Sequence, residues 1–139
     1  HFALKATGYL YILFSELVAL AKGTMRKTEK GHVRRNIIKK AQTFIELNYY
    51  HHIDVDLLCS HVNYSRSYFS RLFKKETGLS VPEYINEVRI RRAKFLIENT
   101  NLNINEVANS VGFEDPFYFS RIFKSIVGLS PINYKKNIS

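Results

Sequence analysis

Apolar residues recur three and four positions apart along most of this chain, and polar residues fill the positions between them. This spacing places the apolar side chains on one face of a helix, so it predicts helices rather than strands. Gly, Pro, Asn, Asp and Ser separate the periodic stretches and mark the helix ends. The pattern predicts an all-α fold, with helices over residues 1–21, 34–50, 53–62, 65–77, 81–99, 102–111, 115–127 and 130–136.

One segment of the chain occurs twice. Residues 65–84, SRSYFSRLFKKETGLSVPEY, return fifty residues later as residues 115–134, DPFYFSRIFKSIVGLSPINY. A repeat at this period indicates two copies of one supersecondary unit. We therefore expect two equivalent units, over about residues 53–77 and 103–127, joined by a connector helix over residues 81–99.

The repeated helix has an apolar face and a polar face on opposite sides. The apolar face is expected to carry Phe69, Leu72, Phe73 and Glu76 in the first copy, and Phe119, Ile122, Phe123 and Ile126 in the second. The polar face carries Ser67, Ser70, Arg71 and Lys74 in the first copy, and Phe117, Ser120, Arg121 and Lys124 in the second. Short hydroxyls and long cations on one exposed face suit the base edges and phosphates of a DNA major groove.

A shorter helix precedes each repeated helix. Its apolar positions are Val55, Leu58, Cys59 and Val62 in the first unit, and Ile104, Val107, Ala108 and Val111 in the second. Each short helix ends at a residue that tolerates the left-handed conformation, Asn63 or Gly112. An aromatic residue of the buried type, Tyr64 or Phe113, follows. A short helix, a tight turn and a second helix together form the helix-turn-helix order.

The connector helix should begin at Ser80, because Ser80 and Glu83 have the spacing of a capping box and Pro82 suits the first turn. We expect Ile85, Val88, Ala93, Phe95 and Leu96 on its buried side. The cations Arg89, Arg91, Arg92 and Lys94 are expected to be mostly solvated, Arg91 and Lys94 more so than Arg89. At about 1.5 Å per residue this helix spans roughly 27 Å. That length can hold two helices near the ~34 Å of one DNA turn.

These residues resemble the DNA-binding domain of the AraC/XylS family of bacterial transcription regulators. The resemblance covers residues 33–136 and rests on SRSYFSRLFKKETGLSVPEYI, RIRRAKFLIENTNLNINEVANSVGF and EDPFYFSRIFKSIVGLSPINYKK. It implies a seven-helix domain whose two recognition helices enter successive major grooves on one face of the DNA. It also implies a preceding domain that senses an effector, such as a sugar, and that dimerises.

The resemblance also implies roles for individual side chains. Base contacts fall on Arg66, Ser67, Ser70, Arg71, Phe117, Ser120 and Arg121, and phosphate contacts are expected at Ser65, Tyr68, Lys74, Ser80, Tyr118, Lys124 and Ser130. Arg71 and Arg121 suit bidentate contact with guanine O6 and N7, although Arg71 could instead bind a phosphate. The two tyrosines could instead belong to the edge of the core. Ser80 and Ser130 are helix caps, where free backbone N–H groups can hold phosphates.

Phe117 is the largest difference between the two polar faces, because it takes the position that Ser67 holds in the first unit. The apolar face of its helix already has four large side chains, so a further aromatic residue needs a separate reason. Contact with a thymine methyl group supplies one. The alternative is that Phe117 curls back onto the preceding helix and joins the core.

The charge of the chain agrees with a nucleic-acid partner. The 139 residues carry a formal net charge of +9, and all of the excess lies in residues 22–139, because Lys5 and Glu16 cancel in residues 1–21. A basic domain of this size favours a polyanion such as double-stranded DNA, although the cations could simply be solvated. The single cysteine, Cys59, excludes an internal disulfide and is typical of a reducing cytoplasm.

The first 33 residues stand apart from the repeated units. Residues 1–21 predict a helix that is apolar on nearly every side and therefore needs burial, and Glu16 argues against a membrane span. We interpret this segment as the last helix of a preceding sensor domain, or alternatively as a helix folded back on the basic domain. Residues 22–33 have no apolar period and are interpreted as a linker, so the DNA-binding domain is expected over residues 34–139.

The sequence therefore predicts a cytoplasmic, sequence-specific DNA-binding transcription regulator, and the resemblance adds activation in response to an effector. RNA polymerase and a second copy of the full-length protein are further candidate partners, and no membrane partner is expected. No enzyme, cofactor or metal is expected either, because catalytic motifs are lacking and His51, His52, Cys59 and His61 do not have zinc-site spacing. The alternative is a helical protein-interaction module with a solubilising basic surface, but the polar face of the first repeated helix lacks the large apolar residues that it would need.

Overall fold

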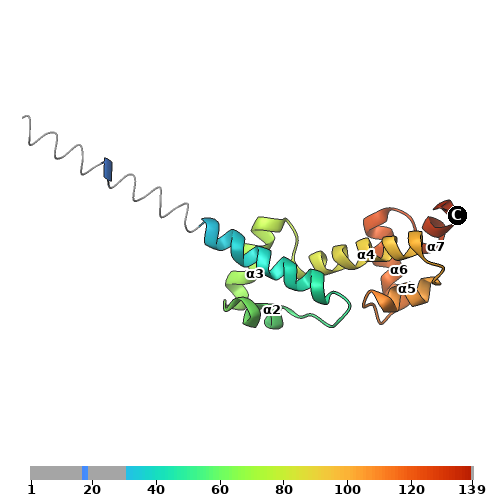
Figure 1. Cartoon of the computed structure of the whole chain (residues 1–139), viewed down its shortest axis with the longest axis horizontal. Helices are drawn as coiled ribbons and strands as arrows, with labels where there is room; N and C mark the ends of the chain where they lie inside the picture. Colours follow the sequence, from blue (N-terminus) through green and yellow to red (C-terminus); the bar gives the residue numbers. More distant parts are fainter. Residues whose placement is uncertain (1–16, 19–30, 139) are drawn as a thin grey trace, which may run out of the picture. The chain divides into compact units, whose positions relative to one another are not determined.

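The computed structural model describes residues 17–18 and 31–138, and every regular element within these ranges is a helix. A helix over residues 31–48 is followed by α2 (Val55–Val62), α3 (Arg66–Thr77), α4 (Val81–Asn99), α5 (Ile104–Ser110), α6 (Pro116–Val127) and α7 (Pro131–Ile138) (Figure 1). This order confirms the predicted all-α fold, with α2–α3 and α5–α6 as the helix-turn-helix units and α4 as the connector. The first helix already includes residues 31–33, which the sequence pattern assigns to the linker.

The predicted amino-terminal helix and linker lie largely outside the described residues. Of residues 1–21 only Leu17 and Val18 are described, and both are helical and exposed. The interpretation of this segment as part of a sensor domain therefore stays a prediction. In the part of the chain that the structure describes, no helix has the length and apolar character needed to cross a membrane.

Local sequence accounts for where the helices begin and end. At the start of α4, the Ser80 hydroxyl accepts a hydrogen bond from the Glu83 N–H, and the Glu83 carboxylate accepts one from the Ser80 N–H, as the capping box predicts. Helix α5 begins with the same arrangement. Asn63 and Gly112 take the predicted left-handed conformation in the two turns, with φ of 58° and 95°. The helix-turn-helix order therefore follows from residues only a few positions apart.

Each unit packs against its own part of α4. The buried residues of α2, α3 and the first half of α4 are Leu58, Cys59, Val62, Phe69, Leu72, Phe73, Val81, Ile85 and Val88. A second cluster joins the remainder of α4 to α5 and α6 through Ile90, Ala93, Ile97, Val107, Ala108, Val111, Phe113, Phe119 and Phe123. Full burial of one large apolar side chain contributes about 1.5–3 kcal/mol, so these contacts hold both units to the connector.

The structure corrects several predicted buried positions. Four side chains that the sequence pattern places in the core are exposed instead: Tyr64, Glu76, Phe95 and Ile126. Because α4 contacts α3 near its start and α5, α6 and α7 further on, its buried face includes Ile90 and Ile97 rather than Phe95, which is 59% exposed. Tyr64 stacks on Tyr68 at the surface, with ring centroids 5.4 Å apart.

Candidate nucleic-acid interface

Helix α3 divides into the two faces that the sequence predicts. Phe69, Leu72 and Phe73 are buried, Ser67, Arg71 and Lys74 are exposed, and Ser70 is half-buried. The Arg71 Nε donates to the Ser67 carbonyl at 3.2 Å. This bond uses one of the five guanidinium N–H groups and leaves the terminal pair for a planar, bidentate contact.

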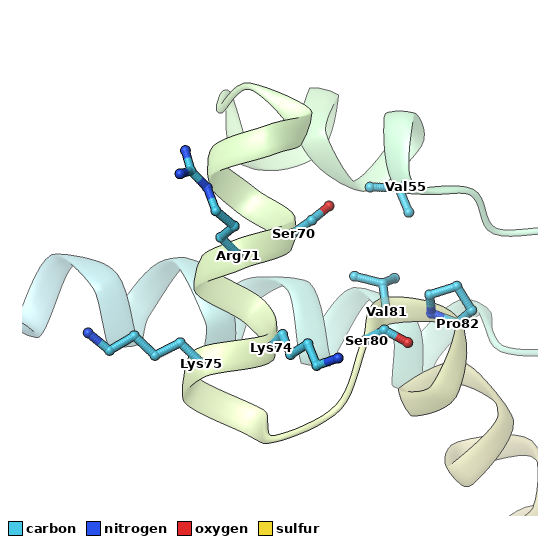
Figure 2. A pocket seen from close by; sticks show the side chains of 8 residues that line it. All are labelled: Val55, Ser70, Arg71, Lys74, Lys75, Ser80, Val81 and Pro82. Atoms are coloured by element: carbon cyan, nitrogen blue, oxygen red, sulfur yellow. The ribbon is translucent and has the colours of Figure 1, made fainter.

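A hollow of about 450 Å³ lies beside the exposed face of α3. Its lining residues, drawn in Figure 2, are Val55, Ser70, Arg71, Lys74, Lys75, Ser80, Val81 and Pro82. The fold thus brings four predicted DNA contacts, from α3 and from the start of α4, to one place. Lys75 is a lining cation that the sequence analysis left out, although it lies four positions after Arg71 and so continues the spacing of the polar face.

The α4 cap at Ser80 has one hydrogen bond in addition to the predicted capping box. The backbone N–H and the hydroxyl of Ser80 both donate to the Glu83 carboxylate, at 2.7 Å each. These hydrogen bonds lower the pKa of Glu83, so its carboxylate is ionised at neutral pH. The N–H of Ser80 itself is therefore bonded to Glu83, and the phosphate contact expected at this cap stays a prediction. At the equivalent cap, Ser130, the residue three positions on is Asn133, whose N–H donates to the Ser130 hydroxyl at 3.3 Å.

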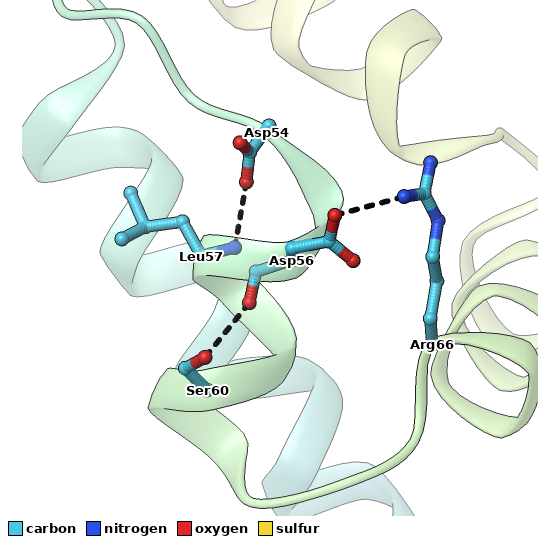
Figure 3. A network of polar contacts seen from close by, with 5 residues as sticks. All are labelled: Asp54, Asp56, Leu57, Ser60 and Arg66. Atoms are coloured by element: carbon cyan, nitrogen blue, oxygen red, sulfur yellow. Dashed lines mark hydrogen bonds and ion pairs between the residues drawn. The ribbon is translucent and has the colours of Figure 1, made fainter.

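Arg66 is held by an acidic partner on the preceding helix. Its Nη1 donates to the Asp56 carboxylate at 2.9 Å, and both side chains are exposed (Figure 3). Asp54 caps the same helix by accepting from the Leu57 N–H at 2.6 Å. Exposed ion pairs contribute roughly 0–1 kcal/mol, so Arg66 can reach a DNA base only by giving up a weak bond to Asp56.

Helix α6 shows the same division of faces. Phe119 and Phe123 are fully buried, whereas Phe117 is 83% exposed. The alternative in which Phe117 joins the core is therefore wrong, because α6 packs on α4 and α5 through its other face. The Phe117 N–H donates to the Asp115 carboxylate at 2.9 Å, so the helix cap orders the first turn. A large aromatic side chain is left on the outer face of this helix.

Two further predicted contacts on α6, Tyr118 and Arg121, lie next to each other. The Tyr118 hydroxyl is 3.4 Å from the Asn86 amide nitrogen, which donates to it, and the Tyr118 ring lies 5.9 Å from that of Phe113. The Arg121 guanidinium lies 5.8 Å from the centroid of the Tyr118 ring. Tyr118 therefore combines packing at the core edge with an exposed surface, whereas Tyr68 in α3 stacks on the exposed Tyr64. Of the other predicted contacts, Ser65 and Lys124 are exposed and Ser120 and Ser130 are half-buried.

The single thiol lies in the core. The pKa of Cys59 is raised, mainly because the thiol is buried and further because the Asp56 carboxylate is nearby. The thiol is thus protonated at neutral pH and lacks the thiolate character of a nucleophile. Within the described ranges, no group of three His, Cys, Asp or Glu side chains lies close enough to hold a metal ion.

Two helix-turn-helix units, each with hydroxyls or cations exposed on its second helix, define the class of helix-turn-helix DNA-binding proteins. The model of a family described as "Helix-turn-helix domain" matches residues 58–137, which is more than half of the chain. The chain belongs to the AraC/XylS family, whose members are sequence-specific DNA-binding transcription regulators.

Three known proteins illustrate the similarity. The Msm operon regulatory protein of Streptococcus mutans is 40% identical over 91% of this chain and 48% of its own length. The lactose operon transcription activator of Staphylococcus xylosus is 35% identical over 73% of this chain and 37% of its own length. The DNA-binding domain of AdpA, a global transcriptional factor solved with a target DNA, superposes with a TM-score of 0.69 at 25% identity, over 72% of this chain and 90% of that one. This chain thus spans about half or less of the length of these curated relatives.

Proposed function

We propose that the chain binds duplex DNA by placing α3 and α6 in successive major grooves on one face of the helix. The observation that supports this most directly is the matched exposure of Arg71 and Arg121 on the outer faces of the two helices, opposite buried phenylalanines. Helix α4 has 19 residues, which at about 1.5 Å each give roughly 28 Å. That length suits two recognition helices separated by about one DNA turn, ~34 Å.

Within this arrangement we assign direct readout to Ser67, Ser70, Arg71, Phe117, Ser120 and Arg121, with Arg66 joining when it leaves Asp56. Phosphate contacts are assigned to Ser65, Tyr68, Lys74, Tyr118, Lys124 and Ser130, with Lys75 added because it lines the same hollow as Lys74. Ser80 also lines that hollow, and its N–H and hydroxyl groups both remain hydrogen-bonded to the Glu83 carboxylate.

At the level of the whole protein, we propose an effector-responsive activator of an operon, acting in the cytoplasm and not as an enzyme. The names of the Msm and lactose operon regulators support this role, because both are curated relatives of this chain. The proposed effector, a sugar or similar small molecule, would bind a domain outside residues 34–139. Dimerisation through that domain and contact with RNA polymerase are part of the same proposal.

The test is selection of bound duplexes from a random pool, followed by a salt titration of the selected sequence. We expect a conserved site with two parts about one helical turn apart. The logarithm of the binding constant should fall linearly with the logarithm of salt concentration, by about 0.9 for each phosphate neutralised. Enrichment of no sequence, together with affinity that stays flat from low to physiological salt, would overturn the DNA-binding proposal.

A further inference from the structure

The two helix-turn-helix units are joined by a second connection besides α4. It consists of residues 49–51, which follow the first helix, Arg89 of α4, and the turn residues Gly112 and Phe113 between α5 and α6. We call these residues the junction. The repeat does not mark the junction, because its residues lie outside both polar faces. The sequence favours a solvated side chain less for Arg89 than for Arg91 and Lys94, but it indicates no partner for Arg89.

Arg89 is the centre of the junction. Its Nε donates to the Tyr49 carbonyl at 2.8 Å and its Nη2 to the His51 carbonyl at 2.9 Å. The guanidinium carbon also lies 5.4 Å from the centroid of the Phe113 ring. Burial lowers the pKa of Arg89, but a guanidinium stays charged in proteins. One half-buried cation thus bonds the segment after the first helix and contacts the turn of the second unit.

Because Gly112 has no side chain, the backbone of residues 49–50 can lie close to the turn of the second unit. Gly112 has a φ of 95°, and a Cβ at this position would lie 2.9 Å from the Tyr49 carbonyl oxygen and 3.0 Å from that of Tyr50. The Tyr49 side chain packs against the core cluster of the second unit, and the Arg92 guanidinium lies over its ring at 5.5 Å. Backbone and side chain of this segment are therefore both in contact with the second unit or its connector.

The other end of the segment belongs to the first unit. Phe44, on the helix that leads into residues 49–51, contacts His61 of α2 with ring centroids 4.7 Å apart. The path from α2 through Phe44 and residues 49–51 to Arg89 and Gly112 closes a loop with α4. A connection at two places resists rotation of one unit against the other, which a single helix does not.

We propose that Arg89 is a positioning residue that sets the distance and relative orientation of α3 and α6, and so determines which spacing between the two halves of a DNA site the protein accepts. This inference rests on the proposed two-groove binding. Two linked binding elements raise each other's effective concentration only when the connection holds them in matching geometry. Arg89 touches no DNA in this role and acts through the junction.

The experiment compares Arg89→Met and Arg89→Lys with wild type on duplexes selected by wild type from a random pool. Three forms of the duplex are needed: the selected sequence, the same sequence with one base pair added between its halves, and the sequence with the second half scrambled. Arg91→Met is the matched control, because it removes one exposed cation, paired with the half-buried Glu46, from the same helix. Thermal melting is recorded for every variant.

For Arg89→Met we expect unchanged binding to the half-scrambled duplex and roughly tenfold weaker binding to the selected duplex, since rigidity of the connection is lost. The preference for the selected over the lengthened duplex should shrink by a similar factor. Arg89→Lys should fall in between, because an ammonium keeps the charge but lacks the fork that binds two carbonyls. Arg91→Met should keep the wild-type preference.

An equal loss on all three duplexes, or a wild-type spacing preference in a folded Arg89→Met variant, would overturn the proposal and leave Arg89 a stabilising residue only. If Arg89→Met does not fold, the spacing preference of Arg89→Lys decides the question by the same criterion. Wild type itself tests the underlying function: if it binds the lengthened or half-scrambled duplex as tightly as the selected one, two-groove binding fails, whatever Arg89 does.

Discussion

The α2–α3 and α5–α6 units share a fold and differ where each unit faces outward or meets the other. Their core positions repeat, since Phe69 and Phe73 correspond to Phe119 and Phe123 and all four are fully buried. The differing pairs are Ser67 and Phe117 on the outer face, Glu83 and Asn133 at the following cap, and Asn63 and Gly112 in the turn. Packing constrains the core residues of both copies in the same way, whereas the residue at each surface position depends on the groups that surround it there.

Among the positions at which the two units differ, the turns offer the largest expected effect. Gly112→Ala should lower the free energy of unfolding by about 3 kcal/mol, because alanine is strained at a φ of 95° and its Cβ would press on the Tyr49 carbonyl. Asn63→Ala, at the equivalent turn with a φ of 58°, should cost about 1 kcal/mol. Urea unfolding of both variants measures the difference. Equal losses would show that the close approach at Gly112 adds nothing to the backbone strain.

The two arginines should have matched effects on separate halves of the DNA site. Arg71→Ala and Arg121→Ala should each weaken specific binding by about 1–3 kcal/mol and relax the preference at one base pair, in a different half for each. Both side chains are exposed, so melting temperatures should not change. Competition assays with single-base substitutions locate the effect. A loss that is the same on selected and scrambled DNA would instead identify a phosphate contact.

The outer faces of α3 and α6 differ most in size at Ser67 and Phe117. Phe117→Ser copies Ser67 of the first unit and should cost about 1 kcal/mol of binding without lowering the melting temperature, since the side chain is 83% exposed. Phe119→Ala is the control for a core position and should cost about 3–5 kcal/mol of stability.

The thymine methyl group can be tested directly in the DNA. Replacing individual thymines of the second half by deoxyuridine removes only that methyl group. We expect one such replacement to weaken binding by wild type and to leave binding by Phe117→Ser unchanged. Wild-type binding that is indifferent to every replacement would contradict the contact.

The smallest expected effect is at the cap. Glu83→Asn copies Asn133 and removes the carboxylate bonded to Ser80, which lines the hollow beside α3. DNA affinity should therefore rise modestly at low salt, and the gain should fade as salt screens the charge. Hydrogen bonds from Ser80 lower the pKa of Glu83 below its ordinary 4.5. The carboxylate therefore stabilises the folded chain above that pH, and its contribution is lost as pH falls through the folded-state pKa.

Unfolding measured from neutral to acidic pH checks this sign. The stability difference between wild type and Glu83→Asn should be constant near neutral pH and should shrink below about pH 4.5. A difference that stays the same down to acid pH would show that the capping box does not depend on the charge of Glu83. The same measurement on Asn133→Glu, the reverse change in the second unit, should create the pH dependence that wild type lacks there.

Much of the fold could be predicted from sequence because its determinants are local. The helices, the capping box at Ser80 and the turn at Asn63 each depend on residues within about one or two helical turns. The outer faces of α3 and α6 were predicted for the same reason, since burial of one side of a helix leaves the other exposed. The error at Phe95 has the opposite origin, because the buried side of the connector helix depends on which other helices pack along it.

By itself, then, the sequence determined the number and order of the helix-turn-helix units, the residues on their outer faces and the family to which the chain belongs. Only the tertiary structure decided that Phe117 stays outside the core and that Arg89 joins the two units. The junction shows the physical reason most clearly. Every residue has a backbone carbonyl, so nothing in the sequence marks those of Tyr49 and His51 as partners until the folded chain brings them to Arg89.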